Sequence, residues 1–210
     1  MFEEYDILYK SIKKEIDNRL KDFDKIKSKH NWHQIYIELC FCVLTPQSKA
    51  VNAWKAIETL VENDLLFKGN AEQISEYLNI VRFKNNKAKY LVNLRDKYYN
   101  NTDIIDVLYS NKSIYEIREW LIDNIQGYGR KEASHFLRNI GFYEDIAILD
   151  RHILKNLNKL NVISEIPKSI TKNYYLETEK KMKVFSDKIN IPISHLDFLF
   201  WYKEAKKIFK

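Results

Sequence analysis

The 210-residue sequence is poor in the residues that interrupt helices or build metal sites: it has four glycines, three prolines and two cysteines. So few glycines and prolines leave little room for a flexible hinge, and the sequence has no low-complexity linker and no convincing repeat. Two cysteines exclude a four-cysteine iron–sulfur cluster or zinc site built by this chain alone. Cys40 and Cys42 alternate within an apolar run, which favours buried thiols over a strained disulfide.

Long apolar runs are absent as well. No segment approaches the ~18 residues that span a bilayer, and the N-terminal stretch, residues 1–17, is charged and lacks the apolar core of a signal peptide. We therefore expect a cytoplasmic protein with no membrane partner. A net charge of +6 and a pI of about 9.0 are compatible with a polyanionic partner such as nucleic acid, although lysine-rich surfaces are usually only solvated.

Apolar residues recur at intervals of three and four over most of the chain, which predicts an all-α fold. The first predicted helix shows the pattern at Leu8, Ile12, Ile16, Leu20, Phe23 and Ile26. Further helices are predicted near 35–43, 48–61, 71–80, 86–99, 113–124, 130–140, 151–160, 171–189 and 193–208, with a break at Pro46. No alternating run is long enough to predict a sheet. We expect one compact helical module over residues 1–210.

Three of the four glycines, Gly127, Gly129 and Gly141, fall within one window of the sequence. The first two lie in a short connection between two predicted helices, of which the first has a capping box formed by Ser113 and Glu116. A turn this tight needs a positive φ, which glycine adopts without a Cβ clash. The pattern is typical of a helix–hairpin–helix element.

The second helix of that element starts at the glycines, so its first N–H groups have no helical partner and suit a phosphate oxygen. Arg130 and Lys131 follow directly and favour contact with a DNA backbone. The alternative is a tight corner between two helices with no ligand. No metal site made of side chains is predicted, although the hairpin carbonyls are candidates for holding a monovalent cation.

Nineteen residues after Lys131, Asp150 ends an apolar run just before another predicted helix. Taken singly, Asp150 is a favoured N-cap residue and Lys131 is an ordinary lysine in a first helical turn. Together with the hairpin they resemble the catalytic pair of the helix–hairpin–helix DNA glycosylase superfamily. That resemblance implies a two-lobed helical fold with the active cleft between the lobes. It places the central lobe at about 28–112, and the helix–hairpin–helix lobe at about 113–210 with the N-terminal helix 1–27.

The best match within the superfamily is the second, archaeal-type family of 8-oxoguanine DNA glycosylase/AP lyases. It extends over nearly the whole chain, through the segments CVLTPQSKAVNAW, RFKNNKAKYL, GYGRKEASHFLRNIG, AILDRHIL and HLDFLFWYKEAKKIFK. The resemblance implies that Lys131 attacks C1′ of the damaged nucleotide and forms a Schiff base, while Asp150 stabilises positive charge on the sugar. Attack requires a neutral amine. The resemblance further implies that the protein needs no cofactor. Its expected partner is double-stranded DNA that contains a damaged base, and the protein is expected to act as a monomer.

The C-terminal segment bears on base recognition. Asp197 and Trp201 are four residues apart, so they face the same way on a helix. Trp201 is a candidate to stack on an extruded base, and Asp197 to accept from guanine N1–H and N2–H₂. Core packing is an equal alternative for Trp201. In the family that the chain resembles, a terminal lysine helps to recognise the damaged base, and Lys210 matches it.

Three other positions carry over more weakly from the resemblance. Gln47 matches the place from which related enzymes insert a wedge into the gap left by the flipped base, and His152 matches a phosphate-contacting position. His135 lies one turn after Lys131 and is a candidate to line the pocket, although a packed histidine fits equally.

The predicted function is excision of 8-oxoguanine followed by strand cleavage. Two alternatives remain: the same chemistry on another oxidised base, or a helix–hairpin–helix module that binds DNA without catalysis.

Overall fold

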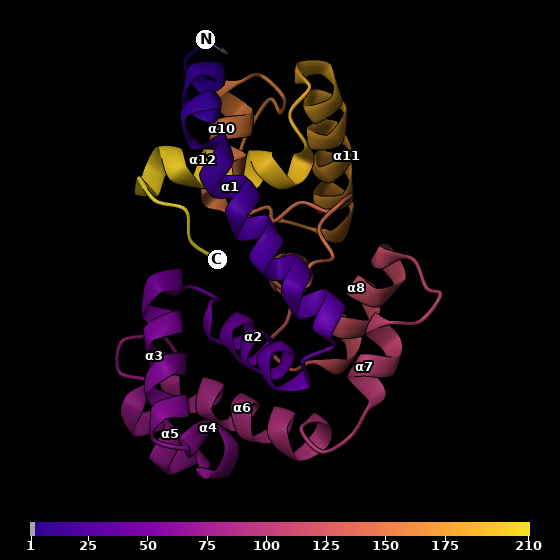
Figure 1. Ribbon diagram of the computed structural model, residues 1–210. Helices are drawn as coiled ribbons and strands as arrows, with labels where there is room; N and C mark the ends of the chain where they lie inside the picture. Colours follow the sequence, from indigo (N-terminus) through magenta and orange to yellow (C-terminus); the bar gives the residue numbers. More distant parts are fainter. Residues whose placement is uncertain (1–2) are drawn as a thin grey trace. The chain divides into compact units, whose positions relative to one another are not determined.

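The computed structural model describes residues 3–210, and the regular structure within that range is helical (Figure 1). This confirms the predicted all-α fold. The helices are α1 (Glu3–Lys29), α2 (Trp32–Leu44), α3 (Ala50–Glu62), α4 (Leu65–Lys68), α5 (Ala71–Tyr77), α6 (Lys84–Tyr98), α7 (Asp103–Leu108), α8 (Ile114–Asn124), α9 (Arg130–Asn139), α10 (Arg151–Lys159), α11 (Lys172–Ile189) and α12 (Ile193–Ala205). None of the helices within residues 3–210 combines the length and the apolar character that a membrane span requires.

The ends of several helices follow directly from the sequence. Helix α2 stops at Leu44 ahead of Pro46, as predicted, and α8 begins with the predicted capping box, in which Ser113 and Glu116 each accept from the other's backbone N–H. Neither cysteine forms a disulfide, and both are fully buried in α2, which confirms the prediction of buried thiols. Burial raises the pKa of Cys40 to about 12, so this thiol stays protonated at neutral pH.

The described residues group into two compact units. One comprises residues 29–136 and the other residues 1–28 with 137–210, so the boundary falls inside α9. Residues 113–136, which the sequence assigned to the second lobe, group with α2 and α6 instead. The hydrogen bonds of the hairpin region explain this: the Tyr128 hydroxyl donates to Leu39 O at 2.9 Å, and the Tyr98 hydroxyl donates to Asn124 O at 3.2 Å.

In the unit formed by both ends of the chain, α1 packs its buried stripe against α12 (Figure 1). Ring contacts and a hydrogen bond join the two helices: the Tyr5 ring lies edge-on to Phe200, and the Tyr9 hydroxyl bonds His195 Nδ1 at 3.0 Å. The predicted stripe is slightly rotated, because Tyr5 and Tyr9 join it. The residues of α1 buried here are Tyr5, Tyr9, Ile12, Ile16, Leu20 and Phe23.

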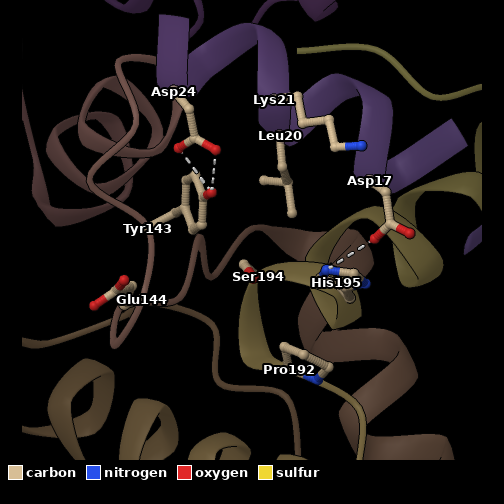
Figure 2. Close-up of a pocket in the computed structure, with 9 residues that line it drawn as sticks. All are labelled: Asp17, Leu20, Lys21, Asp24, Tyr143, Glu144, Pro192, Ser194 and His195. Atoms are coloured by element: carbon tan, nitrogen blue, oxygen red, sulfur yellow. Dashed lines mark hydrogen bonds and ion pairs between the residues drawn. The ribbon is translucent and has the colours of Figure 1, made fainter. Parts of the chain in front are cut away.

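The same unit carries an open groove of about 410 Å³ between α1, the loop after α9 and the start of α12. Figure 2 shows its acidic side chains: Asp24 accepts from the Tyr143 hydroxyl at 2.8 Å, and Asp17 lies 3.7 Å from His195 Nε2. Burial lowers the pKa of His195, against the opposing effect of Asp17, and so favours the neutral ring. A groove with this acidic lining does not favour a phosphate backbone.

Candidate active site

The hairpin between α8 and α9 has the backbone geometry that its glycines predict. Gly127 has a φ of 88°, and a Cβ on it would come within 3.0 Å of the Tyr90 ring. Gly129 has no positive φ, and a Cβ there would meet the flexible carboxylate of Glu132 at 3.2 Å. Gly127 is therefore required by conformation and by space, whereas Gly129 is required mainly by the close approach of Glu132.

The first turn of α9 presents backbone N–H groups that the described residues leave without side-chain acceptors. Glu132 reaches back to accept from Gly129 N–H at 3.2 Å, which satisfies one amide before the helix. The N–H groups of Arg130, Lys131 and Glu132 lie in the turn where an α-helix has no internal acceptor. They are suitably placed for an anion, and the positive end of the helix dipole adds to this.

The side chain of Lys131 is partly buried at the start of α9. Its Nζ donates to Thr45 Oγ1 at 3.2 Å and lies 3.7 Å from Glu132 Oε1. The Thr45 hydroxyl in turn donates to Cys42 O at 3.0 Å, so its lone pair is free to accept from Nζ. The amine is therefore held by a neutral hydroxyl beside the end of α2, with one carboxylate at longer range.

Two neighbours of Lys131 have partners in the structure. The Arg130 guanidinium bonds both carboxylate oxygens of Glu119, at 2.8 and 2.5 Å. His135 is buried, 4% exposed, with its ring edge-on to Phe41. A phosphate bound by Arg130 has to compete with Glu119, and His135 reaches a substrate only through a movement of side chains.

Asp150 caps α10 with one of its two carboxylate oxygens. Its Oδ1 accepts from His152 N–H at 2.8 Å and from Ile153 N–H at 2.9 Å. Within residues 3–210, Oδ2 has no hydrogen-bond partner. The capping role that the sequence suggested is confirmed, and it leaves one oxygen of a partly exposed carboxylate available for other chemistry.

Trp201 and His152 lie together in the same unit. Their rings are edge-on, with centroids 5.1 Å apart, and the Trp201 side chain is partly exposed. The indole Nε1 of Trp201 is buried and has no hydrogen-bond partner among the described residues. A buried indole N–H normally finds an acceptor, so this donor is compatible with a bound group that the protein alone does not supply.

Asp197 is buried, 7% exposed, and one of its carboxylate oxygens accepts from the Arg138 guanidinium in a close ion pair. Arg138 also lies over the Phe198 ring at 4.4 Å. Asp197 thus has a structural partner on α9, and its contact with a base stays a prediction. Lys210 is partly exposed, and its predicted contact with the damaged base stays a prediction too.

Gln47 lies at an exposed position in the turn between α2 and α3. Its φ is 53°, a left-handed conformation that is uncommon for a side chain of this kind. Ser48 N–H closes the turn by donating to Thr45 O at 3.0 Å. The strained, exposed position suits a side chain that projects toward a ligand.

Comparison with known proteins shows the family of this chain. The family model described as Ogg-HhH, 8-oxoguanine DNA glycosylase, matches residues 16–191. A protein of Fusobacterium nucleatum named 8-oxoguanine DNA glycosylase/AP lyase is 52% identical over 211 residues, which cover 100% of this chain and 97% of the relative. This chain belongs to the 8-oxoguanine DNA glycosylase family.

Solved structures in the family have the same fold. The crystal structure of the Methanocaldococcus jannaschii 8-oxoguanine glycosylase/lyase in complex with a 15mer DNA containing 8-oxoguanine is 35% identical, with a TM-score of 0.87, and the match covers 100% of this chain and 99% of that one. The 8-oxoguanine DNA glycosylase of Thermotoga maritima is 27% identical with a TM-score of 0.86, over 100% and 98% of the two chains.

Within this glycosylase fold, the structure also shows a residue that the sequence did not single out. Lys87 on α6 is 3% exposed, and its ammonium bonds the turn that carries Thr45 and Gln47. Its signal in the sequence is only a lysine at an inward position of an otherwise polar helix start. The predicted cleft and the predicted pairing of Lys131 with Asp150 stay predictions.

Proposed function

We propose that this chain removes 8-oxoguanine from duplex DNA and then cleaves the strand at the abasic site by β-elimination. The observation that carries the proposal is the arrangement around Lys131: a partly buried amine on a hydroxyl acceptor, in the first turn of the helix that follows the hairpin. The chain also belongs to a family in which similar proteins are named 8-oxoguanine DNA glycosylase/AP lyase, and this supports both activities.

Lys131 is the proposed nucleophile. Its neutral Nζ forms a bond to C1′ as the bond from C1′ to N9 of the base breaks, and the base leaves with the electron pair of that bond. The bound nitrogen then loses one proton and forms the C1′=N double bond of the protonated Schiff base, while the C1′–O4′ bond of the sugar breaks and O4′ leaves with its electron pair to become a hydroxyl. Removal of a proton from C2′ then expels the 3′ phosphate. The Thr45 hydroxyl orients the amine, since a single acceptor at 3.2 Å holds Nζ without fixing its charge.

Asp150 is proposed to act through the carboxylate oxygen that does not cap α10. Loss of the base builds positive charge on the deoxyribose, and a carboxylate fixed by two backbone N–H groups stabilises that charge without reorganising. The same carboxylate is a candidate acceptor for the proton that Lys131 releases.

DNA binding is proposed to use the open start of α9 and the groups around it. The hairpin at Gly127 and Gly129 and the amides that follow take a phosphate, and Arg130 and His152 add contacts to the backbone. Gln47 enters the gap left by the extruded nucleotide.

Trp201, with its unpartnered indole N–H, is proposed to contact the extruded base together with Asp197, Lys210 and His135. We propose that the protein acts as a monomer in the cytoplasm.

A lesion panel tests this function. Purified enzyme is incubated with matched duplexes that contain 8-oxoguanine, an oxidised pyrimidine, undamaged guanine or an abasic site, and free base and strand cleavage are measured separately. We expect base release from the 8-oxoguanine duplex well above the other lesions, and cleavage of the abasic duplex. Release of an oxidised pyrimidine alone would assign the same chemistry to another base, and tight binding with no release or cleavage would identify a non-catalytic module.

A further inference from the structure

The buried lysine of α6, Lys87, has an unusual number of partners. Its Nζ donates to Leu44 O at 2.7 Å, to Pro46 O at 2.8 Å and to Ser48 Oγ at 3.0 Å. An ammonium has three N–H donors, and all three are used. A lysine is rarely buried to 3% exposure unless its charge is compensated in this way.

The three acceptors all belong to the end of α2 and the turn that follows it. That turn holds Thr45, whose hydroxyl accepts from the Lys131 amine. It also holds the exposed residue Gln47, whose backbone is left-handed with a φ of 53°. The backbone carbonyls at the end of α2 lack helical donors, so a cation there satisfies them and complements the negative end of the helix dipole.

The same ammonium reaches a second loop through Ser48. The Ser48 hydroxyl accepts from Lys87 and also from the backbone N–H of Arg82 at 3.0 Å, while Asn52 donates to Ile80 O at 3.1 Å. The turn before α3 and the loop before α6 are therefore held together. Lys87 lies at the centre of the bonds that join them.

The charge state of Lys87 supports this role. The pKa of Lys87 is lowered to about 8 in all: burial is the main cause and nearby Lys131 adds to it, while Glu132 opposes both effects. At pH 7 the amine therefore keeps its proton and with it all three donors. An apolar side chain of similar length fills the space and removes the ammonium donor from Leu44 O, Pro46 O and Ser48 Oγ.

We propose that Lys87 is a positioning residue for catalysis, which holds the Thr45–Ser48 turn so that Thr45 orients the Lys131 amine while Gln47 projects into the duplex. The inference rests on the proposed function, because it assigns Lys87 to the same site. Lys87 touches neither the substrate nor the reacting atoms. Misplacement of reacting groups by about 1 Å costs roughly 100-fold in rate, so a loosened turn has a measurable effect.

The test compares Lys87→Met with Lys97→Met, a change of an exposed lysine in the last turn of the same helix. Single-turnover base excision is measured at saturating enzyme, with the active fraction of each preparation determined by borohydride trapping. We expect Lys87→Met to slow excision roughly 10- to 100-fold and Lys97→Met to match the wild type. Equal rates for wild type and Lys87→Met would overturn the proposal.

A double-mutant cycle with Gln47→Ala separates positioning from a general loss of stability. If Lys87 acts through the turn, the double variant is about as slow as the slower single variant, because each change disables the same turn. Independent effects that multiply in the double variant would show that Lys87 does not act through Gln47.

Hydrogen exchange gives a readout that does not depend on activity. The amides of Ser48 and Arg82 are bonded within the network, so both exchange faster in Lys87→Met than in the wild type, while the amides in the middle of α1 are unchanged. Unchanged protection at Ser48 and Arg82 would contradict the inference. A wild-type enzyme that binds DNA but releases no base would instead contradict the proposed function, whatever the exchange result.

Discussion

The starts of helices α9 and α10 differ in one respect that matters for function. At α9 the hairpin supplies glycine in place of a capping side chain, and the first-turn amides of the helix keep no side-chain acceptor among the described residues. At α10 the carboxylate of Asp150 accepts from two of the equivalent amides. The first-turn N–H groups of α9, the open start, are available to a ligand. Those of α10, the closed start, hold the Asp150 carboxylate in place.

This difference shows how a capping residue can take the catalytic role that we propose for Asp150. The two backbone bonds to Oδ1 hold the Asp150 carboxylate in one orientation and leave Oδ2 without a partner in the described part of the chain. A carboxylate held in this way does not need to reorganise as charge develops on a sugar. The cap is therefore part of the proposed mechanism, and structural and catalytic roles are compatible at Asp150.

The largest expected effect separates these two roles at α10. Asn is as good an N-cap as Asp, so Asp150→Asn keeps the helix start and removes only the charge. We expect base excision to fall by about 10²–10³ with little change in Tm, since fixed electrostatic groups contribute about that much. Single-turnover excision and thermal unfolding measure the two quantities.

Asp150→Ala is the matched control, because it removes the cap as well as the charge. It should lose about 1 kcal/mol of stability in addition to the catalytic loss. An Asp150→Asn variant that excises 8-oxoguanine at the wild-type rate would show that the carboxylate serves only the helix.

The next effect concerns the open start of α9. Gly127→Ala forces a Cβ onto a φ of 88° and to within 3.0 Å of the Tyr90 ring, so we expect a loss of about 1–2 kcal/mol in stability together with weaker DNA binding. Gly129→Ala meets only the movable Glu132 carboxylate and should be milder. Equal losses in the two variants, measured by denaturant unfolding and DNA titration, would count against this account of the hairpin.

A smaller effect is expected from Glu119, whose carboxylate pairs with Arg130 at the start of α9. Glu119→Gln removes the carboxylate charge that pairs with the Arg130 guanidinium. We expect DNA affinity to rise a few-fold at low salt and the gain to shrink at high salt, because the freed guanidinium can pair with a phosphate. Unchanged or weaker binding would remove Arg130 from the proposed DNA contacts.

The smallest effect concerns a third helix start, that of α12, where His195 is buried. Burial lowers its pKa, so the folded protein binds fewer protons than the unfolded chain near pH 6. Its contribution to stability is therefore complete above the ordinary pKa of about 6.5 and falls as the pH drops below it. His195→Gln should show a shallower loss of Tm between pH 7 and pH 5; an identical slope would show that His195 is not responsible.

The sequence predicted most of the long helices because their apolar spacing is a local property. It missed α4 (Leu65–Lys68) and α7 (Asp103–Leu108), which are too short to show a period. It singled out Lys131 and Asp150 as candidates because each is tied to a local motif, a glycine hairpin or a helix cap. The structure confirms that Lys131 lies in the first turn of α9 and that Asp150 caps α10, and their catalytic roles stay predictions. Gln47 became a candidate only through the resemblance of the chain to the family.

The sequence could not predict the burial of charged residues whose partners are distant along the chain. Lys87 is buried because its acceptors lie about 40 residues away, at the end of α2, and Asp197 is buried because Arg138 pairs with it across 59 positions. A charged residue in a polar stretch gives no sign that such partners exist.

In the proposed mechanism the amine of Lys131 bonds covalently to the sugar of the damaged nucleotide. Borohydride reduction during the reaction with an 8-oxoguanine duplex tests it most directly, with the cross-linked residue located by peptide mapping. We expect a covalent complex at Lys131 that is absent in Lys131→Gln, although this variant still binds the duplex. A complex that persists in Lys131→Gln, or that maps to another lysine, would contradict it.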